Sequence, residues 1–315
     1  MWFNCGTRAT VAALAVTWMV AGCNSAPAAG PGSTVQPLGL DTQQPFPIDR
    51  GDDGTATPGT YKGLWLRLID NGEPQITAVD GVIGVVCVGM SNSNQECADW
   101  ILRLDAEYAP EVNPAVRVIN CAVGGHAIEK WIDPAFDGTL WDDCLGRRLT
   151  QAGVRPDQVL VIYHKAADQF TTATGGGALP TYPAAGSDFE NFHTNLSVFS
   201  IRVKVKFPFV RAVYTSSRSY GGFANTAGRG EPLSYEEGHA LNLWLDENRS
   251  VDGVWYGWGP YLWAPSCTEG MTNKGGICYD RADYVADGVH PSATGQAKVS
   301  QLIHSRLRQD AWYMR

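Results

Sequence analysis

Short apolar runs alternate with amphipathic segments along most of the chain from residue 82 onward. Each run is rich in β-branched side chains and apolar at successive positions, which is typical of a strand buried on both faces of a parallel sheet. The strands expected on this pattern are residues 82–88, 116–123, 158–163, 209–214 and 254–263.

Between these runs, apolar side chains recur at helical spacing. The helices expected are residues 96–108, 140–152, 188–204, 235–247 and 295–307. Strands that alternate with helices of this length indicate βαβ units with right-handed crossovers. The sequence therefore predicts a three-layer α/β/α sandwich around a central parallel sheet, with residues 61–69 and 74–79 as two short strands ahead of it.

The first long apolar run breaks sharply at Gly89-Met90-Ser91-Asn92. Open α/β sheets bind their ligands at the carboxyl ends of the strands, so Ser91 is expected where a ligand would lie. A helix-like segment follows, and the N–H of Ser91 would then point from a helix N-terminus toward developing negative charge. The alternative is that Ser91 is only a helix cap.

A serine needs a neighbouring base before it becomes a nucleophile. The candidate base is His290, in Asp287-Gly288-Val289-His290-Pro291, with Asp287 three residues earlier to orient its ring. Taken alone, Asp-x-x-His is more often a turn with a surface histidine. The early serine, the late Asp-x-x-His and a glycine pair after the second strand, Gly124-Gly125, together favour catalysis.

The segments GMSNSN, NCAVGG and DGVHP resemble the motifs of the SGNH (GDSL-like) hydrolase superfamily, in the form closest to its carbohydrate esterases. The resemblance spans residues 82–307 and implies a serine esterase that uses no cofactor. It implies that Ser91 is the nucleophile, His290 the general base and acid, and Asp287 the residue that orients His290. The oxyanion hole would use the backbone N–H groups of Ser91 and Gly125, with Gly124 as the alternative glycine.

The third motif departs from the family. Gly-x-Asn-Asp is usual there, and its asparagine donates a third hydrogen bond to the oxyanion. This chain has His164-Lys165-Ala166-Ala167-Asp168, so that Ala167 replaces the asparagine and only Asp168 is retained. Loss of one oxyanion donor costs about 100-fold in turnover. Lys165 or His164 could substitute as donor, and the alternative for Lys165 is an ordinary surface lysine.

Candidates for substrate contacts are Asn92 and His126, beside the motifs, and Arg218 with Tyr220 after the fourth strand. An arginine beside a tyrosine can bind a carboxylate or stack on a sugar, or it can form a structural ion pair. The aromatic run within residues 255–263 could form a stacking platform, although core packing explains at least half of its rings.

The N-terminus carries an apolar segment too short to span a membrane, which closes with Val20-Ala21-Gly22-Cys23. This ending resembles the lipobox of bacterial lipoproteins, and an ordinary signal peptide is the alternative. The expected organisation is a signal peptide over residues 1–22, a Pro/Gly/Ser-rich tether over 23–60 and one catalytic domain over 61–315. The protein is then exported and anchored at Cys23 by lipid, in the periplasm or at the cell surface.

Of the eight cysteines, Cys5 and Cys23 belong to the leader and the anchor, so eight minus two leaves six for up to three disulfides. Cys267 and Cys278 are expected to close a Gly-rich loop, whereas Cys87 and Cys121 could be disulfides or buried thiols. The spacings predict neither a metal site nor a phosphate loop, so no cofactor is expected. A net charge of −8 without a basic stripe argues against a nucleic-acid partner.

These observations predict a serine esterase that removes a small acyl group, most plausibly acetyl, from a carbohydrate ester. Two alternatives remain from the sequence. An acyltransferase would use the same three side chains but exclude water from the acyl-enzyme. A non-catalytic carbohydrate-binding protein would keep the fold after losing the third-motif asparagine.

Overall fold

The computed structural model describes residues 68–315, except 166, 172–178, 181, 183, 265 and 268–275. The expected signal peptide, the tether, the lipid site at Cys23 and most of the strand expected at 61–69 lie outside the described residues. None of the helices in the described part of the chain is long and apolar enough to cross a membrane.

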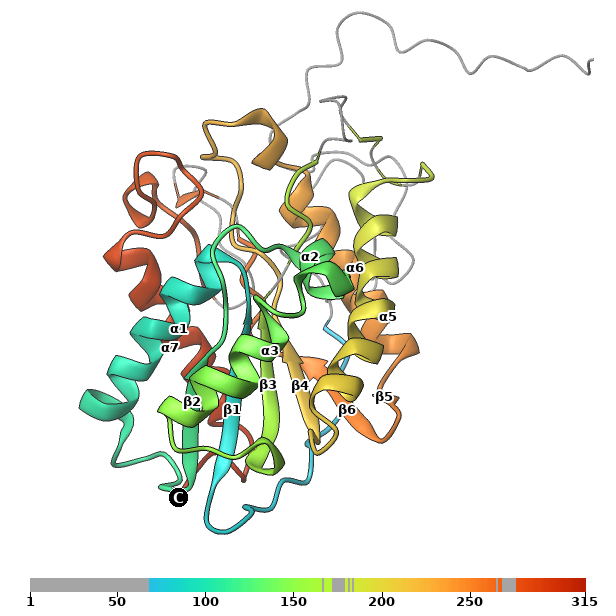
Figure 1. The fold of residues 1–315 in the computed structure, drawn as a ribbon. Coiled ribbons are helices and arrows are strands. Elements are labelled where there is room, and N and C mark those ends of the chain that lie inside the picture. Colours follow the sequence, from blue (N-terminus) through green and yellow to red (C-terminus); the bar gives the residue numbers. More distant parts are fainter. Residues whose placement is uncertain are drawn as a thin grey trace, which may run out of the picture. The chain divides into compact units, whose positions relative to one another are not determined.

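The core of the domain is a six-stranded sheet with the order β2-β1-β3-β4-β6-β5 (Figure 1). All neighbouring strands are parallel except the last pair, in which β5 runs antiparallel to β6. The strands are β1 (Ile83–Gly89), β2 (Val116–Asn120), β3 (Val159–Lys165), β4 (Ala212–Thr215), β5 (Ser250–Val251) and β6 (Val254–Trp258).

Helices cover both faces of this sheet, as the side chains of β1 demonstrate. Val86 and Val88 pack into one buried cluster with the helices α2 (Ile128–Ile132), α5 (Asp188–Lys206) and α6 (Leu233–Glu247). Val85 and Cys87 point the other way, into a second cluster with α1 (Ser91–Arg103) and α7 (Ala293–Leu307). The expected α/β/α sandwich is therefore confirmed.

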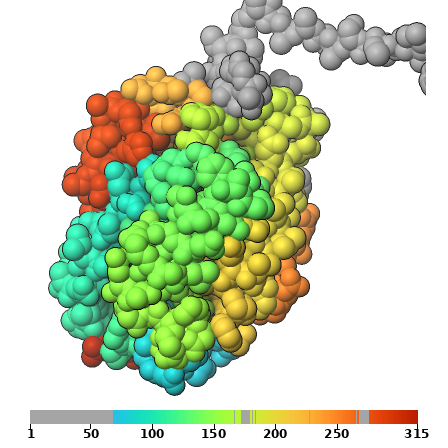
Figure 2. Space-filling view, viewed as in Figure 1, coloured from blue at the N-terminus to red at the C-terminus, as the bar shows by residue number. Residues whose placement is uncertain are grey.

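The helical segment expected at 140–152 is three short pieces in succession: α3 (Trp141–Asp143), a π-helical turn (Cys144–Arg148) and α4 (Leu149–Gln151). Figure 2 shows the segment from α2 to α4, in green, at the surface between α1 and α5. Both α2 and the two-residue strand β5 were missed, because neither is long enough to show a periodic pattern.

The strand expected at 74–79 is wrong. In the structure this segment is irregular and ends in a turn, where Val79 and Val82 exchange two backbone hydrogen bonds of 2.9 and 3.0 Å. Its side chains Ile76 and Ala78 pack against the cluster on the α1 side. The apolar side chains that suggested a strand are instead used to cover this cluster, and neither neighbour of β1 in the sheet is this segment, since β1 pairs with β2 and β3.

The helix expected from Glu96 begins five residues earlier, at Ser91. The polar run Ser91-Asn92-Ser93-Asn94 lacks apolar periodicity and is typical of a turn. In the structure three of these side chains donate to carbonyl groups of three separate loops: Asn92 to Val289 O, Ser93 to Lys165 O and Asn94 to Ala122 O. Tertiary hydrogen bonds therefore hold the first turn of α1.

Beneath this turn lies a buried ion pair between α1 and the end of β3. The ammonium of Lys165 contacts both carboxylate oxygens of Glu96 at 2.6 Å, and the two side chains are only 4% and 1% exposed. Lys165 is therefore not the surface lysine that the sequence allowed. The pair fixes the position of α1 relative to β3.

Three disulfides are present among the described residues. Cys267–Cys278 forms as expected, and Cys87–Cys97 and Cys121–Cys144 resolve the choice left open for the two strand cysteines. Cys87–Cys97 joins β1 directly to α1, and Cys121–Cys144 joins the end of β2 to the π-helical turn.

We expect Lys165→Met to destabilise the fold by about 3–5 kcal/mol, because it leaves the Glu96 carboxylate buried without its partner. Urea unfolding at pH 7 measures this loss. The double variant Glu96→Met/Lys165→Met should recover most of it, since no buried charge remains. Arg249→Met, which breaks an exposed pair with Asp246, serves as the control and should cost under about 1 kcal/mol. Equal losses in the single and double variants would contradict this account.

Candidate active site

The strand order places the site residues at one edge of the sheet. The chain passes from β1 outward to β2 and then returns to β3 on the other side of β1. Parallel sheets bind ligands at the carboxyl ends of the strands, where such a reversal opens a crevice. Ser91 follows β1, Gly124 and Gly125 follow β2, and Ala167 follows β3, so all four lie at this reversal.

Ser91, His290 and Asp287 form a continuous chain of hydrogen bonds. The Ser91 Oγ lies 2.7 Å from His290 Nε2, and His290 Nδ1 lies 2.5 Å from Asp287 Oδ2. The serine comes from the start of α1, and the other two come from the turn ahead of α7, 199 residues along the chain from Ser91 to His290. The expected proximity of the three side chains is therefore present in the structure.

The Asp287 carboxylate is fixed by its own turn. Its Oδ1 accepts from the N–H groups of Val289 and His290 at 2.9 and 3.0 Å. Burial acts to raise the pKa of Asp287, but the hydrogen bonds from the His290 ring and from these two N–H groups outweigh it and lower the pKa to about 2. Asp287 is therefore ionised at neutral pH and can accept from the imidazole.

Glycine is required within this turn. Gly288 has φ +69°, and a Cβ placed there would lie 1.7 Å from the carbonyl oxygen of Phe223. The turn therefore packs directly on the segment that contains Phe223. Asn225 of that segment donates from its backbone N–H to Asp287 O at 3.0 Å, which further fixes the aspartate.

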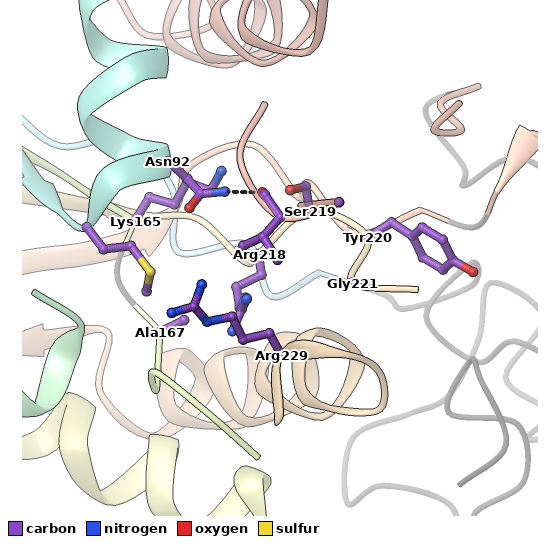
Figure 3. A pocket seen from close by; sticks show the side chains of 11 residues that line it. Asn92, Lys165, Ala167, Arg218, Ser219, Tyr220, Gly221 and Arg229 are labelled. Atoms are coloured by element: carbon purple, nitrogen blue, oxygen red, sulfur yellow. Dashed lines mark hydrogen bonds between the residues drawn. The ribbon is translucent and has the colours of Figure 1, made fainter. Parts of the chain in front are cut away.

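Asn92 links α1 to the turn that carries His290. Its side-chain amide donates to Val289 O at 2.8 Å, the dashed contact in Figure 3. The sequence predicted that Asn92 contacts substrate. In the structure it lines the pocket, but its amide N–H is used to hold the histidine turn against α1.

Gly124 and Gly125 form an exposed corner opposite Ser91. A Cβ on Gly124 would lie 3.8 Å from the Ser91 Cβ, and Gly125 has φ +71°, a left-handed conformation that favours glycine. The corner is held by Val123 N–H, which donates to Gly89 O, and by Lys130 Nζ, which donates to Gly125 O. Its backbone can thus approach a group bound at Ser91.

Ser91 and His290 open into a pocket of about 290 Å³. The pocket is lined by residues from several separate segments of the chain: Met90, Ser91, Asn92, Gly124, Gly125, Gln169, Arg218, Arg229, Val289 and His290. None of these lining residues is Phe, Tyr or Trp. The pocket can hold a small acyl group and part of the molecule that carries it.

The other residues expected at the site lie as follows. Ala167 is 1% exposed, and Lys165 engages Glu96; both line a smaller hollow beside the pocket, with Arg218 and Arg229. His126 contacts Gly124 O through Nδ1 at 2.8 Å and packs edge-on to Phe136, and it is not a lining residue. The Tyr220 ring packs on Phe223 and is turned away from Arg218 in Figure 3.

The aromatic run near residues 255–263 belongs to the core. Tyr256, Trp258 and Trp263 are at most 4% exposed and pack into the cluster on the α5 side. Trp255 is less buried and packs against Tyr214 on the other face. None of these rings lines the Ser91 pocket, so core packing is the interpretation that the structure supports.

Sequence reasoning missed Arg229, which lines the same pocket as Ser91. It lies in a short 3-10 turn (Ala227–Arg229) inside an irregular segment, and no motif or periodicity points to it. Only the packing of that segment against the Asp287 turn brings Arg229 to the site.

Asp168, the retained residue of the third motif, is buried rather than directed at substrate. Its Oδ1 accepts from Asn195 Nδ2 at 2.7 Å, while Oδ2 is buried and has no hydrogen-bond partner in the described part of the chain. Burial and the nearby Glu129 carboxylate raise the pKa of Asp168 to about 8. The side chain is therefore largely protonated at pH 7.

Within the described ranges, no three His, Cys, Asp or Glu side chains are grouped as a metal site would require.

No family model and no curated protein matches the chain. Similar solved structures include a lipase/acylhydrolase from Enterococcus faecalis (17% identity, 72% of this chain and 95% of that chain, TM-score 0.41). They also include a GDSL-like lipase from Bacteroides thetaiotaomicron (10% identity, 75% of this chain and 92% of that chain, TM-score 0.41). A third is a catalytic mutant of an acetylxylan esterase from Geobacillus stearothermophilus (12% identity, 73% of this chain and 95% of that chain, TM-score 0.43). At this distance, every role proposed below rests on the geometry of the chain itself.

We expect Asp168→Asn to change how stability depends on pH. With a folded pKa of about 8 and an unfolded pKa near ~3.9, the folded state holds a proton that the unfolded chain releases between these values. This group therefore lowers the free energy of unfolding as pH rises through that window, by up to about 1.4 kcal/mol per pH unit.

Asparagine keeps the acceptor for Asn195 and removes the titration. Urea unfolding at pH 5, 6, 7 and 8 should show a stability gain of Asp168→Asn over the original protein that grows with pH. The exposed substitution Asp246→Asn controls for loss of one negative charge. Parallel pH profiles for Asp168→Asn and the original protein would show that Asp168 is ionised when folded.

Proposed function

We propose that the protein is a serine ester hydrolase of the SGNH (GDSL-like) type. The observation that carries the proposal is the unbroken chain from the Ser91 hydroxyl through the His290 ring to the Asp287 carboxylate, at 2.7 and 2.5 Å. This chain opens into a pocket beside the glycine corner. A hydroxyl, a base and an orienting carboxylate in this order are what nucleophilic catalysis at an ester requires.

In the proposed reaction the Ser91 Oγ attacks the ester carbonyl carbon while His290 Nε2 takes its proton. Asp287, ionised at neutral pH, accepts from Nδ1–H and stabilises the imidazolium. The tetrahedral intermediate then collapses, and His290 gives the proton to the departing alcohol. Water, deprotonated by His290, attacks the acyl-serine, and collapse of the second intermediate releases the acid and restores the serine.

The proposed oxyanion hole has two backbone donors, the N–H groups of Ser91 and Gly125. Ser91 is the first residue of α1, where N–H groups lack acceptors within the helix and the helix dipole favours negative charge. Ala167 has no side-chain donor, and the Lys165 ammonium is held by both oxygens of Glu96. We expect turnover to be about 100-fold below that of a site with a third donor.

The substrate that we propose is a small acyl ester, most plausibly acetyl, on a carbohydrate or a related alcohol. The volume of the pocket supports a small acyl group. We also propose that the protein is exported and anchored by lipid at Cys23. The three disulfides support an oxidising compartment.

We expect the protein to react with a fluorophosphonate at Ser91. Ser91→Ala should abolish labelling, and His290→Ala should reduce both labelling and p-nitrophenyl acetate turnover by at least about 1000-fold, because the serine loses its base. Asp287→Asn should lower turnover by up to about 10,000-fold. Mass spectrometry of the labelled peptide identifies the modified residue.

Ser305→Ala, an exposed serine of α7, is the matched control and should label like the original protein. A folded protein that neither labels nor turns over ester would exclude the esterase, and binding of carbohydrate by Ser91→Ala would then indicate a binding protein. Acyl transfer to an added alcohol in preference to water would instead indicate an acyltransferase.

A further inference from the structure

Two arginines from separate places in the sequence meet at the Ser91 pocket. Arg218 follows β4 and Arg229 ends the 3-10 turn, and both side chains line the pocket of Ser91 and His290 as well as the adjoining hollow. In Figure 3 both guanidinium groups point into the space between Asn92 and Ala167. Two positive charges therefore face the same cavity, in a protein whose net charge is −8.

Neither guanidinium is neutralised by an ion pair with a carboxylate among the described residues. Arg218 Nη1 donates to the backbone oxygen of Asp168 at 3.3 Å, and Arg229 lies 4.9 Å above the ring of Phe170. Most arginines of the described chain differ in this respect, since they form ion pairs of 3.6 Å or less; examples are Arg103, Arg147, Arg155, Arg306 and Arg308.

The acidic groups around the pair are mostly hydrogen-bonded or have a pKa raised by burial, although Asp188, whose pKa burial raises to about 6, is still largely ionised at pH 7. The Asp287 carboxylate binds His290, and exposed Glu129 accepts from Gln169 N–H at 2.9 Å. Behind Arg218, burial raises the pKa of Asp168 to about 8 and holds the pKa of Glu237 well above its usual range. These neighbours consequently carry less negative charge than their number suggests, and the positive charge of the two arginines remains directed at the pocket.

The segment that carries Arg229 is held against the site by backbone hydrogen bonds. Gly228 O accepts from Thr171 N–H at 2.7 Å, and Asn225 N–H donates to Asp287 O. Glu231, just beyond, accepts from Gly221 N–H and Tyr235 N–H. The backbone position of Arg229 relative to Ser91 is therefore set by the fold before any ligand binds.

We propose that Arg218 and Arg229 form a subsite for an oxyanion group, a carboxylate or a phosphate, carried by the same molecule as the scissile ester. The inference rests on the esterase function proposed above and names its substrate class: acyl esters of acidic sugars or similar anionic alcohols. Paired guanidinium groups match the planar oxygens of these anions. No Phe, Tyr or Trp lines the Ser91 pocket itself, which agrees with recognition by charge there; Tyr220 lines only the adjoining hollow.

One other role for the pair makes a different prediction. Ala167 lines the hollow beneath both arginines, so either guanidinium could act on the oxyanion in place of the missing asparagine. An oxyanion donor raises kcat for every ester, whereas an anion subsite favours only charged substrates. The ratio of activities on charged and neutral esters separates the two roles.

The test compares acetate release from an O-acetylated methyl glucuronoside, from its neutral uronic methyl ester and from O-acetylated glucose 6-phosphate. We expect kcat/KM to be at least about tenfold higher for a charged ester than for the neutral one, mainly through KM. The uronate and phosphate arms show which anion is preferred. Raising NaCl should reduce the preference.

Arg229→Gln should lower the ratio of charged to neutral kcat/KM by about tenfold, and Arg229→Lys should retain part of it. Arg249→Gln, at an exposed arginine two residues beyond the end of α6 (Leu233–Glu247), is the matched control and should keep the full ratio. Thermal unfolding of each variant checks that the fold is intact. Equal activity of the original protein on charged and neutral esters would overturn the proposal. An equal loss of kcat on both in Arg229→Gln would assign the arginine to the oxyanion instead.

A binding measurement keeps the test independent of turnover. Calorimetric titration of glucuronate into Ser91→Ala should give a Kd at least about tenfold tighter than into Ser91→Ala/Arg229→Gln. If the protein neither labels with fluorophosphonate nor turns over ester, yet binds glucuronate in this arginine-dependent way, the esterase fails and the anion subsite stands. Equal binding by the two variants would overturn the subsite whether or not the enzyme is active.

Discussion

The site depends on the side-chain hydrogen bonds made by the first turn of α1. Asn92, Ser93 and Asn94 each donate from the side chain to a carbonyl of a different loop: the histidine turn, the end of β3 and the segment after β2. These three loops carry His290, Ala167 and the glycine corner. Ser91 heads the same turn, so one set of hydrogen bonds fixes the proposed nucleophile, its proposed base His290 and the glycine corner relative to one another.

A buried ion pair between α1 and β3 lies next to this first turn of α1. Glu96 lies one turn further along α1 than Asn92 and binds Lys165 at the end of β3, where the Cys87–Cys97 disulfide also joins strand and helix. A buried ion pair contributes little net stability compared with apolar side chains. We infer that the pair contributes specificity of position, because any shift of α1 against β3 would separate two buried charges.

Two positively charged arginines line the pocket, whereas the whole chain has a net negative charge. An acidic protein repels anions at long range, but salt screens exposed charges beyond about 8 Å at physiological ionic strength. Within that distance Arg218 and Arg229 line the pocket, and burial raises the pKa of the nearby Asp168 and Glu237. The same pair lies above Ala167, where the oxyanion hole lacks a side-chain donor. The proposed anion subsite and the proposed oxyanion hole with only two donors therefore lie next to each other in one cavity.

The sequence by itself determined the layered α/β/α fold, the succession of its five longest strands along the chain and the positions of Ser91, Asp287 and His290 at turns that could meet. These depend on local composition: apolar runs define strands, and a polar break after a run marks a loop at the end of a strand. The tertiary structure decided the rest. The Ser91–Asn94 run became helix because distant carbonyls accept from its side chains, and residues 74–79 pack their apolar side chains against the core instead of joining the sheet. Lys165 is buried because Glu96 faces it, and Arg229 reaches the pocket only through packing on the Asp287 turn. Contacts between residues far apart in sequence leave no local pattern, which is why the proposed reacting groups could be predicted from the sequence and the charges around them could not.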